Sequence, residues 1–176
     1  MPRSITSEEL RELQRPIKDR YGNDPSTARI TLEADGTLDE DIACSVQTGR
    51  ALVKAGLHPG TGGDGTLACS GDMLLQALVA CAGVTMRSVA TSMGLSVSGS
   101  VHAEGDLDWR GTLAVDKEAP VGFKDIRLRF ELESEAGDEE LETLQRLTER
   151  YCVVFQTLMA SPTLSVSMER GQSTPG

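Results

Sequence analysis

The sequence lacks the features that mark several large classes of protein. Acidic residues outnumber basic ones, 27 to 17, so the net charge is −10 and no basic stripe could neutralise phosphates. This argues against nucleic-acid binding. The N-terminus "MPRSITSEELRELQRP" contains no apolar segment of the kind found in signal peptides, so we expect a cytoplasmic protein. The longest uninterrupted apolar run has about 14 residues, fewer than the ~20 that a membrane span requires.

Several catalytic and metal-binding motifs are also missing. There is no CxxC pair, and neither histidine stands near a cysteine at zinc-ligand spacing, so we expect no metal. The glycine-rich stretch "GLHPGTGGDGTLACSGD" lacks GxxxxGK[ST], which argues against nucleotide binding. The absence of GxSxG argues against a serine hydrolase. We therefore expect no bound cofactor.

The chain of 176 residues is long enough for one domain with a buried core. Structural disulfides are rare in a reducing compartment, so the cysteines are either inert buried thiols or members of a reactive pair. The sequence contains four of them, Cys44, Cys69, Cys81 and Cys152.

The first third of the chain predicts a helix followed by strands. Thr6 and Glu9 can form a capping box for a helix over residues 6–21, and Pro16 is expected to disturb its later half. Alternating apolar residues then predict two strands joined by a turn at "ADGTLDE". The glycine-rich stretch follows as a long loop, which is typical of a functional or flexible segment.

A long apolar helix over residues 71–94 dominates the middle of the chain. Gly94 suits its C-terminal end, and Gly83 inside it indicates close packing against a neighbour. Since both sides of this helix are apolar, we expect a central helix that is packed on nearly every side.

The last part of the chain predicts strands around further helices. Residues 95–103 and 124–134 alternate as strands, and residues 137–161 predict a helix with a break near Tyr151–Val153. A final strand is predicted over residues 162–170. The order of these elements predicts an α+β domain, in which central helices pack against antiparallel sheet.

Two of the cysteines occur in a recognisable order. "LACSGDMLLQALVACAGVTMRSVATSMGL", then strands, then "LQRLTERYCVVFQTL" and "TLSVSMER", resembles the OsmC/Ohr family of thiol-dependent peroxidases. The resemblance places an OsmC-like domain at residues 27–170, after a helical extension at 1–26 and before a disordered tail at 171–176. It implies the OsmC-like fold, with antiparallel sheets packed around long central helices in an intertwined homodimer.

The resemblance also implies a mechanism. Cys81 matches the cysteine that attacks an organic hydroperoxide and becomes a sulfenic acid, as expected of an antioxidant protein of the stress response. Cys152 matches the cysteine that resolves this acid as a disulfide, which a dithiol or a lipoylated protein then reduces. The chemistry is consistent, because a thiolate is the nucleophile and a nearby thiol protects a sulfenic acid from further oxidation.

The sequence departs from the family pattern around these cysteines. The family usually has a glutamate about ten residues before the first cysteine, where this chain has Gly71, and an arginine in the preceding loop, which this chain lacks. Proline commonly follows the second cysteine, where this chain has Val153. The side chains that we consider as substitutes for the arginine and the glutamate are Arg50, Arg87, Asp72 and Gln76.

Two functions therefore remain open. The first is an enzyme, a peroxidase in which Cys81 and Cys152 react, with Arg50 lowering the pKa of the Cys81 thiol and Asp72 orienting the arginine. The second is a non-catalytic OsmC-like dimer that binds a small apolar ligand or senses oxidation. Trp109 and Arg110 could line a substrate-facing edge, and Cys69 could compete with Cys152 as the resolving thiol.

Overall fold

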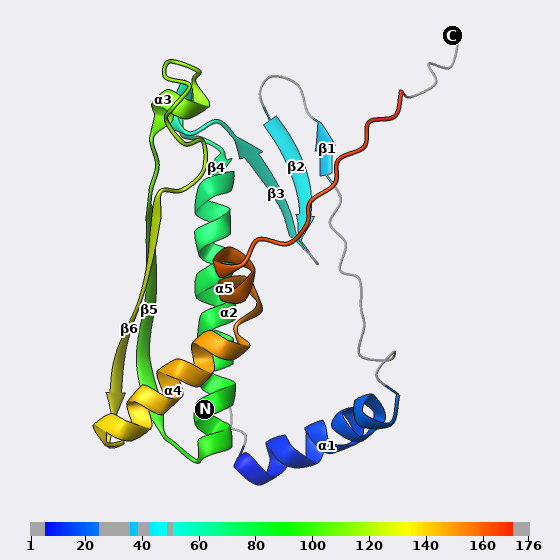
Figure 1. Ribbon diagram of the computed structural model, residues 1–176, viewed down its shortest axis with the longest axis vertical. Helices are drawn as coiled ribbons and strands as arrows, with labels where there is room; N and C mark the ends of the chain where they lie inside the picture. The colour runs from blue at the N-terminus through cyan, green and yellow to red at the C-terminus, as the bar shows by residue number, and fades with distance from the viewer. Residues whose placement is uncertain (1–5, 25–35, 39–42, 49–50, 171–176) are drawn as a thin grey trace.

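The computed structural model of the protein describes residues 6–24, 36–38, 43–48 and 51–170 (Figure 1). A single long helix, α2 (Ser70–Met93), forms its axis. A β-hairpin runs along one side of α2, and helices α4 and α5 lie across another. The architecture is the predicted α+β arrangement of antiparallel strands around central helices.

Helix α2 begins and ends close to the predicted positions. Cys69 is its N-cap but contributes no side-chain hydrogen bond, and Gly94 ends it in the left-handed conformation with φ of 74°. The Gly94 N–H donates to the carbonyls of Ala90 and Thr91, which closes the last turn. Glycine adopts this conformation without steric cost, which is why the helix ends here.

Strands β5 (Val97–Asp106) and β6 (Asp125–Ser134) form the long hairpin. They pair antiparallel along their whole length, from Val97 opposite Ser134 to Asp106 opposite Asp125. In β6, exposed and half-buried residues alternate, which confirms the predicted pattern. Strand β5 continues through Gly99. The φ of Gly99 is 134°, and an added Cβ would clash with the Glu131 carbonyl oxygen at 1.9 Å.

A second, smaller sheet lies beside the N-terminal end of α2 (Figure 1). It contains β1 (Gly36–Leu38), β2 (Ala43–Thr48), β3 (Ala51–Gly56) and β4 (Ala68–Cys69) in that order. All pairs are antiparallel except β3 with β4. The predicted turn "ADGTLDE" was wrong in part, because its middle residues form β1. The first of the two strands predicted there, which precedes the turn, falls outside the described residues.

Helix α1 (Ser7–Asn23) has the predicted cap. The Thr6 hydroxyl accepts from the Glu9 N–H, and the Glu9 carboxylate accepts from the Thr6 N–H. The expectation that Pro16 would disturb the helix was wrong, since α1 continues through it. Pro16 is exposed, so water can satisfy the carbonyl that proline leaves without a donor.

The remaining helices complete the described chain. The predicted break at Tyr151–Val153 is confirmed, because Cys152 separates α4 from α5. The four remaining helical elements of the described chain are η2 (Pro59–Thr61), a 3₁₀ turn, the short α3 (Trp109–Thr112), α4 (Asp138–Tyr151) and α5 (Val153–Met159).

The core lies between the C-terminal half of α2, the start of β5 and the middle of α4. Its fully buried members are Met86, Ala90, Val97 and Leu144. Phe130 and Leu132 of β6 pack against this cluster from the hairpin side. The core is therefore at one end of α2, and the other helix faces have less cover.

The prediction that α2 is packed on nearly every side is wrong for a single chain. Val84 is 72% exposed and Leu74 is 38% exposed. By length and composition α2 could also cross a membrane: its best window has mean hydropathy 1.5 and is 28% buried. This is weak evidence for a span, because core helices of soluble proteins pass the same test. The helix of 24 residues is therefore longer than the uninterrupted apolar run of about 14 residues, from which we had excluded a membrane span.

The predicted strand over residues 162–170 is absent from the chain as described. The segment has no regular secondary structure and leads away from α5 on the side of the small sheet (Figure 1). Leu164, Val166 and Met168 alternate along it and are 83%, 95% and 96% exposed. The alternation that predicted a strand is present, but no strand of the described chain pairs with this segment.

Candidate functional site

Cys81 lies in the middle of α2, which contacts α5 (Figure 1). Its side chain is half-buried. Leu78, one turn earlier, is 1% exposed. Thr85 lies one turn later, and its hydroxyl donates a hydrogen bond to the Cys81 sulfur. The thiol is therefore held on an otherwise apolar stretch of the helix.

Cys152 lies at the joint between α4 and α5, and its side chain is 1% exposed. Its backbone is extended, with φ of −74° and ψ of 108°, so the residue ends one helix and begins the next. The first N–H groups of a helix have no acceptor within it. Two of those in α5, from Val153 and Val154, donate to the Cys81 sulfur.

The structure brings the two thiols together, and the Cys152 thiol hydrogen-bonds to the Cys81 sulfur. Burial alone would raise the pKa of Cys81. The N–H of Val154, the Cys152 thiol, the N–H of Val153 and the Thr85 hydroxyl together outweigh burial. The pKa of Cys81 is therefore lower than that of an ordinary thiol.

The pKa of Cys152 changes in the opposite direction. Burial raises it most, the Phe155 N–H lowers it, and both the hydrogen bond to Cys81 and the charge on Cys81 raise it further. As pH rises, Cys81 is expected to lose its proton first, while Cys152 remains a thiol. A nucleophilic thiolate beside a neutral thiol can be oxidised and can then form a disulfide.

Replacement of Val153 by proline tests the source of the low pKa. Proline removes one N–H donor to Cys81 but suits the first position of a helix, and the extended Cys152 backbone is compatible with a following proline. We expect α5 to remain and the pKa of Cys81 to rise, so that alkylation of Cys81 reaches half its maximal rate at higher pH. Peptide-resolved iodoacetamide labelling measures this. Val153→Ala, which shortens an exposed side chain but keeps the N–H, is the control and should leave the pH profile unchanged.

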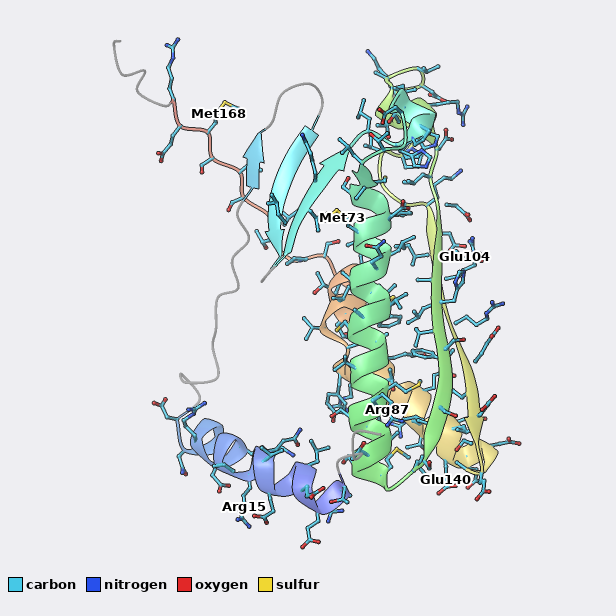
Figure 2. The ribbon with its side chains drawn as sticks, turned by 180° about the vertical axis from the view of Figure 1, so that it is seen from behind. Arg15, Met73, Arg87, Glu104, Glu140 and Met168 are labelled. Atoms are coloured by element: carbon cyan, nitrogen blue, oxygen red, sulfur yellow. The ribbon has the colours of Figure 1, made fainter. Side chains whose placement is uncertain are left out.

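Of the two arginine candidates, the described chain places only Arg87, and it does not meet the thiols. Arg50 lies outside the described residues, so its role stays a prediction. Arg87 lies in the C-terminal half of α2 and donates to the Val97 carbonyl of β5 (Figure 2). Hydrogen bonds, two of them from backbone N–H groups, therefore lower the pKa of Cys81. In the family pattern a cation has this role. The predicted break at Cys152 was the sequence signal that could have revealed these donors.

Asp72 and Gln76 lie elsewhere on α2. Both are exposed and line a shallow depression together with His102 of β5. Asp72 precedes Cys81 by nine residues, which is about 13 Å along a helix and half a turn away around it. Within one chain, the structure does not bring the Asp72 carboxylate to the thiols.

The other two cysteines also lie apart from the pair. Cys69 is twelve residues before Cys81, or about 18 Å along the helix axis, so it cannot resolve Cys81 within the same chain without unfolding α2. Cys44 is on β2, with its backbone opposite Ala55 of β3, as expected for a strand residue. No disulfide joins Cys69, Cys81 and Cys152, which are all free thiols.

An apolar pocket of about 540 Å³ is lined by residues that lie one helical turn from each thiol. Leu74 and Leu78 of α2 form one wall, and Phe155 of α5 forms another. Leu78 is one turn from Cys81, and Phe155 is one turn from Cys152. The rest of the lining comes from Leu158, Met159 and the start of β6, with Lys124 and Asp125 as its charged members.

Trp109 packs against the glycine-rich loop. Its ring stacks on His58 with the centroids 5.0 Å apart and the planes 23° apart. Gly60 has no room for a side chain, because a Cβ would lie 2.6 Å from the Trp109 Nε1. The neighbouring Arg110 pairs with Asp108 and lowers the pKa of that carboxyl to about 2. Trp109 therefore holds the loop in place within the described chain.

No metal site accompanies these residues. Across the part of the chain that the structure describes, no three His, Cys, Asp or Glu side chains are grouped so that they could hold a metal ion.

The family model described as "OsmC-like protein" matches residues 63–167, which is more than half of the chain. The chain belongs to the OsmC-like protein family. The match includes both thiols, the apolar pocket and the α2–α5 contact, while α1 lies outside it.

Solved structures of OsmC-like proteins have a similar fold. An OsmC-like protein from Mycoplasma pneumoniae superposes with a TM-score of 0.64 at 16% identity, over 75% of this chain and 89% of that one. An OsmC-like protein of unknown function from Vibrio cholerae gives 0.60 at 14% identity, over 73% and 94%. A hypothetical protein from Aquifex aeolicus gives 0.57 at 16% identity, over 76% and 90%. These likenesses to solved structures show the OsmC-like fold. No curated protein matches the chain.

Proposed function

We propose that this protein is a thiol-dependent peroxidase that reduces organic hydroperoxides. The observation that carries the proposal is the contact between Cys81 and Cys152, with the pKa of Cys81 lowered and that of Cys152 raised. Membership of a family that includes peroxidases supports it. In this proposal Cys81 is the attacking residue and Cys152 the resolving residue.

The steps follow from the positions of the two sulfurs. The Cys81 thiolate attacks the distal oxygen of the hydroperoxide, the O–O bond breaks, and the alkoxide takes a proton and leaves as an alcohol. Cys81 is then a sulfenic acid. The Cys152 sulfur attacks the Cys81 sulfur, water leaves, and a disulfide forms. A dithiol supplies the two electrons that restore both thiols and becomes a disulfide itself.

The surroundings of Cys81 favour an organic substrate over hydrogen peroxide. Leu78 and Phe155, one helical turn from Cys81 and Cys152, line an apolar pocket together with Leu74. This surface can bind an alkyl or aryl group by removing it from water. The same pocket also supports the alternative of a non-catalytic protein that binds an apolar ligand. Turnover separates the two functions.

The test is consumption of cumene hydroperoxide with dihydrolipoamide as the dithiol. We expect many turnovers per chain and slower consumption of hydrogen peroxide under the same conditions. Oxidation of about one equivalent of hydroperoxide followed by arrest, with dithiol present, would reject the enzyme in favour of the binding or sensing protein.

We also propose that the protein is a homodimer. The alternating Leu164, Val166 and Met168 lack cover within the described chain. A second copy can supply it, because an unpaired strand pattern finds partners by adding to another sheet. Arg50, which no described contact places, could then reach the thiols of either copy.

Sedimentation tests this assembly. We expect a dimer at micromolar concentration, and we expect deletion of residues 163–176 to weaken it by removing the three exposed apolar residues. Deletion of residues 171–176 alone is the matched control and should leave the dimer intact. A folded monomer of the full chain at micromolar concentration would contradict the proposal.

A further inference from the structure

A second pocket, which Thr85 helps to line, lies between α1, α2 and α4. Its volume is about 690 Å³. Helix α1 supplies one wall, and it lies outside the region that matches the OsmC-like family. Its lining consists of Leu10, Gln14, Lys18, Val84, Thr85, Ser88, Val89, Ser92, Met93, Leu147 and Tyr151.

The charge of this lining is unusual for so acidic a chain. The protein carries a net charge of −10, yet the pocket contains one cation, Lys18, and no carboxylate. Lys18 is exposed, and within the described chain its ammonium has no ion pair or hydrogen bond. The guanidinium of Arg150, outside the lining, lies 5.6 Å from the centre of the ring of the lining residue Tyr151. The pocket therefore favours an anion.

Polar groups without partners lie along the α2 wall. Within the residues that the structure describes, the hydroxyls of Ser88 and Ser92 make no hydrogen bond, and neither does the Gln14 amide of the facing helix. These groups can bind the oxygens of a ligand or its bound water. Arg15 of α1, in contrast, pairs with Glu12 at 2.8 Å and lies on the side of α1 away from α2 (Figure 2).

The inner part of the pocket is apolar. Leu10, Val89 and Leu147 are half-buried and come from three different helices, whereas Lys18 is exposed. The α2 wall extends from Val84 to Met93, or about 13 Å along a helix. An apolar interior, a length of this order and a cation in the exposed part together fit an amphipathic molecule with an anionic head.

We propose that this pocket binds a monocarboxylate with a medium-length alkyl chain, its carboxylate beside Lys18 and its chain between Leu10, Val89 and Leu147. The ligand is bound without a chemical step. The proposal does not depend on peroxidase activity, because no residue of the thiol pair lines this pocket. Thr85 belongs to the lining and also contacts Cys81, so occupancy is expected to change the rate at which Cys81 is alkylated.

Titration calorimetry with decanoate, using the full chain with Cys81→Ser to prevent turnover, tests the site. We expect decanoate to bind, and decanol to bind about five- to tenfold more weakly because it lacks the charge. Lys18→Ala should weaken decanoate binding by a similar factor and abolish the preference over decanol. Lys124→Ala is the matched control, since it removes the same charge from the apolar pocket beside Phe155.

The outcomes separate this site from the others. No binding of decanoate, or equal losses in both lysine variants, overturns the proposal. A loss in Lys124→Ala alone also overturns it, because the ligand would then occupy the other pocket. Ser88→Leu, which fills the cavity, should reduce the binding of both ligands in protein whose circular dichroism is unchanged, and unaltered binding would count against the site. The peroxidase assay is independent of all these results.

Discussion

Replacement of Cys81 by serine is expected to abolish the consumption of cumene hydroperoxide in the presence of dithiol. A serine hydroxyl in the same position is not ionised at neutral pH, so the hydrogen bonds from Val153 and Val154 have no thiolate to stabilise. The loss should be at least a thousandfold, because a barrier that rises by about 4 kcal/mol slows a reaction by that factor. Initial rates of hydroperoxide loss measure it.

Replacement of Cys152 by serine should give a different result. Cys81 can still be oxidised, since Val154 and Thr85 still donate hydrogen bonds, but the sulfenic acid has no thiol beside it. We expect a single fast oxidation, dimedone labelling of Cys81, and slow overoxidation with excess hydroperoxide. Cys69→Ser, about 18 Å along the helix from Cys81, is the control and should turn over like the wild type.

Two results would reject the two-thiol mechanism. One is equal hydroperoxide consumption by the wild type and Cys81→Ser. The other is continued hydroperoxide consumption by Cys152→Ser at the wild-type rate, measured with a reductant that reduces disulfides but not sulfenic acids.

The second large effect concerns the core. Leu144 of α4 is 0% exposed and packs with Met86, Ala90 and Val97. Leu144→Ala leaves a cavity that three elements cannot easily close, so we expect the free energy of unfolding to fall by about 2–5 kcal/mol. Urea denaturation followed by circular dichroism measures it at a fixed protein concentration, because association of two copies would also affect stability.

A matched substitution at the surface gives the comparison for this measurement. Val115 is 72% exposed in the loop after α3, so Val115→Ala should change the free energy of unfolding by less than about 0.5 kcal/mol. Similar losses in the two variants would show that Leu144 is not part of the stabilising core.

Much of the fold could be predicted because its signals are local. The Thr6–Glu9 capping box, Gly94 at the end of α2 and the alternation of β6 depend on residues that are only a few positions apart. The errors occurred where a local signal was ambiguous. "ADGTLDE" contains turn residues, yet the backbone of Gly36–Leu38 pairs with β2, and pairing with another strand overrides weak turn preferences.

The candidate site was predictable only in part. Both cysteines were named from the order of the elements, but the groups that lower the pKa of Cys81 were sought among cations. The structure shows backbone N–H groups of α5 in that position. Backbone donors have no signature in residue type, since every residue except proline carries one, so only the position of the helix start reveals them.

The sequence by itself determined the long apolar helix, the alternating hairpin strand, the break at Cys152 and the acidic character of the protein. Each follows from the preferences of neighbouring residues or from composition. Tertiary structure alone decided that Cys152 meets Cys81 across 71 positions, that α5 directs its N–H groups at the Cys81 sulfur, and that Lys18 faces α2. Such contacts depend on how helices pack against one another, and packing free energy is shared among residues that are far apart in the chain.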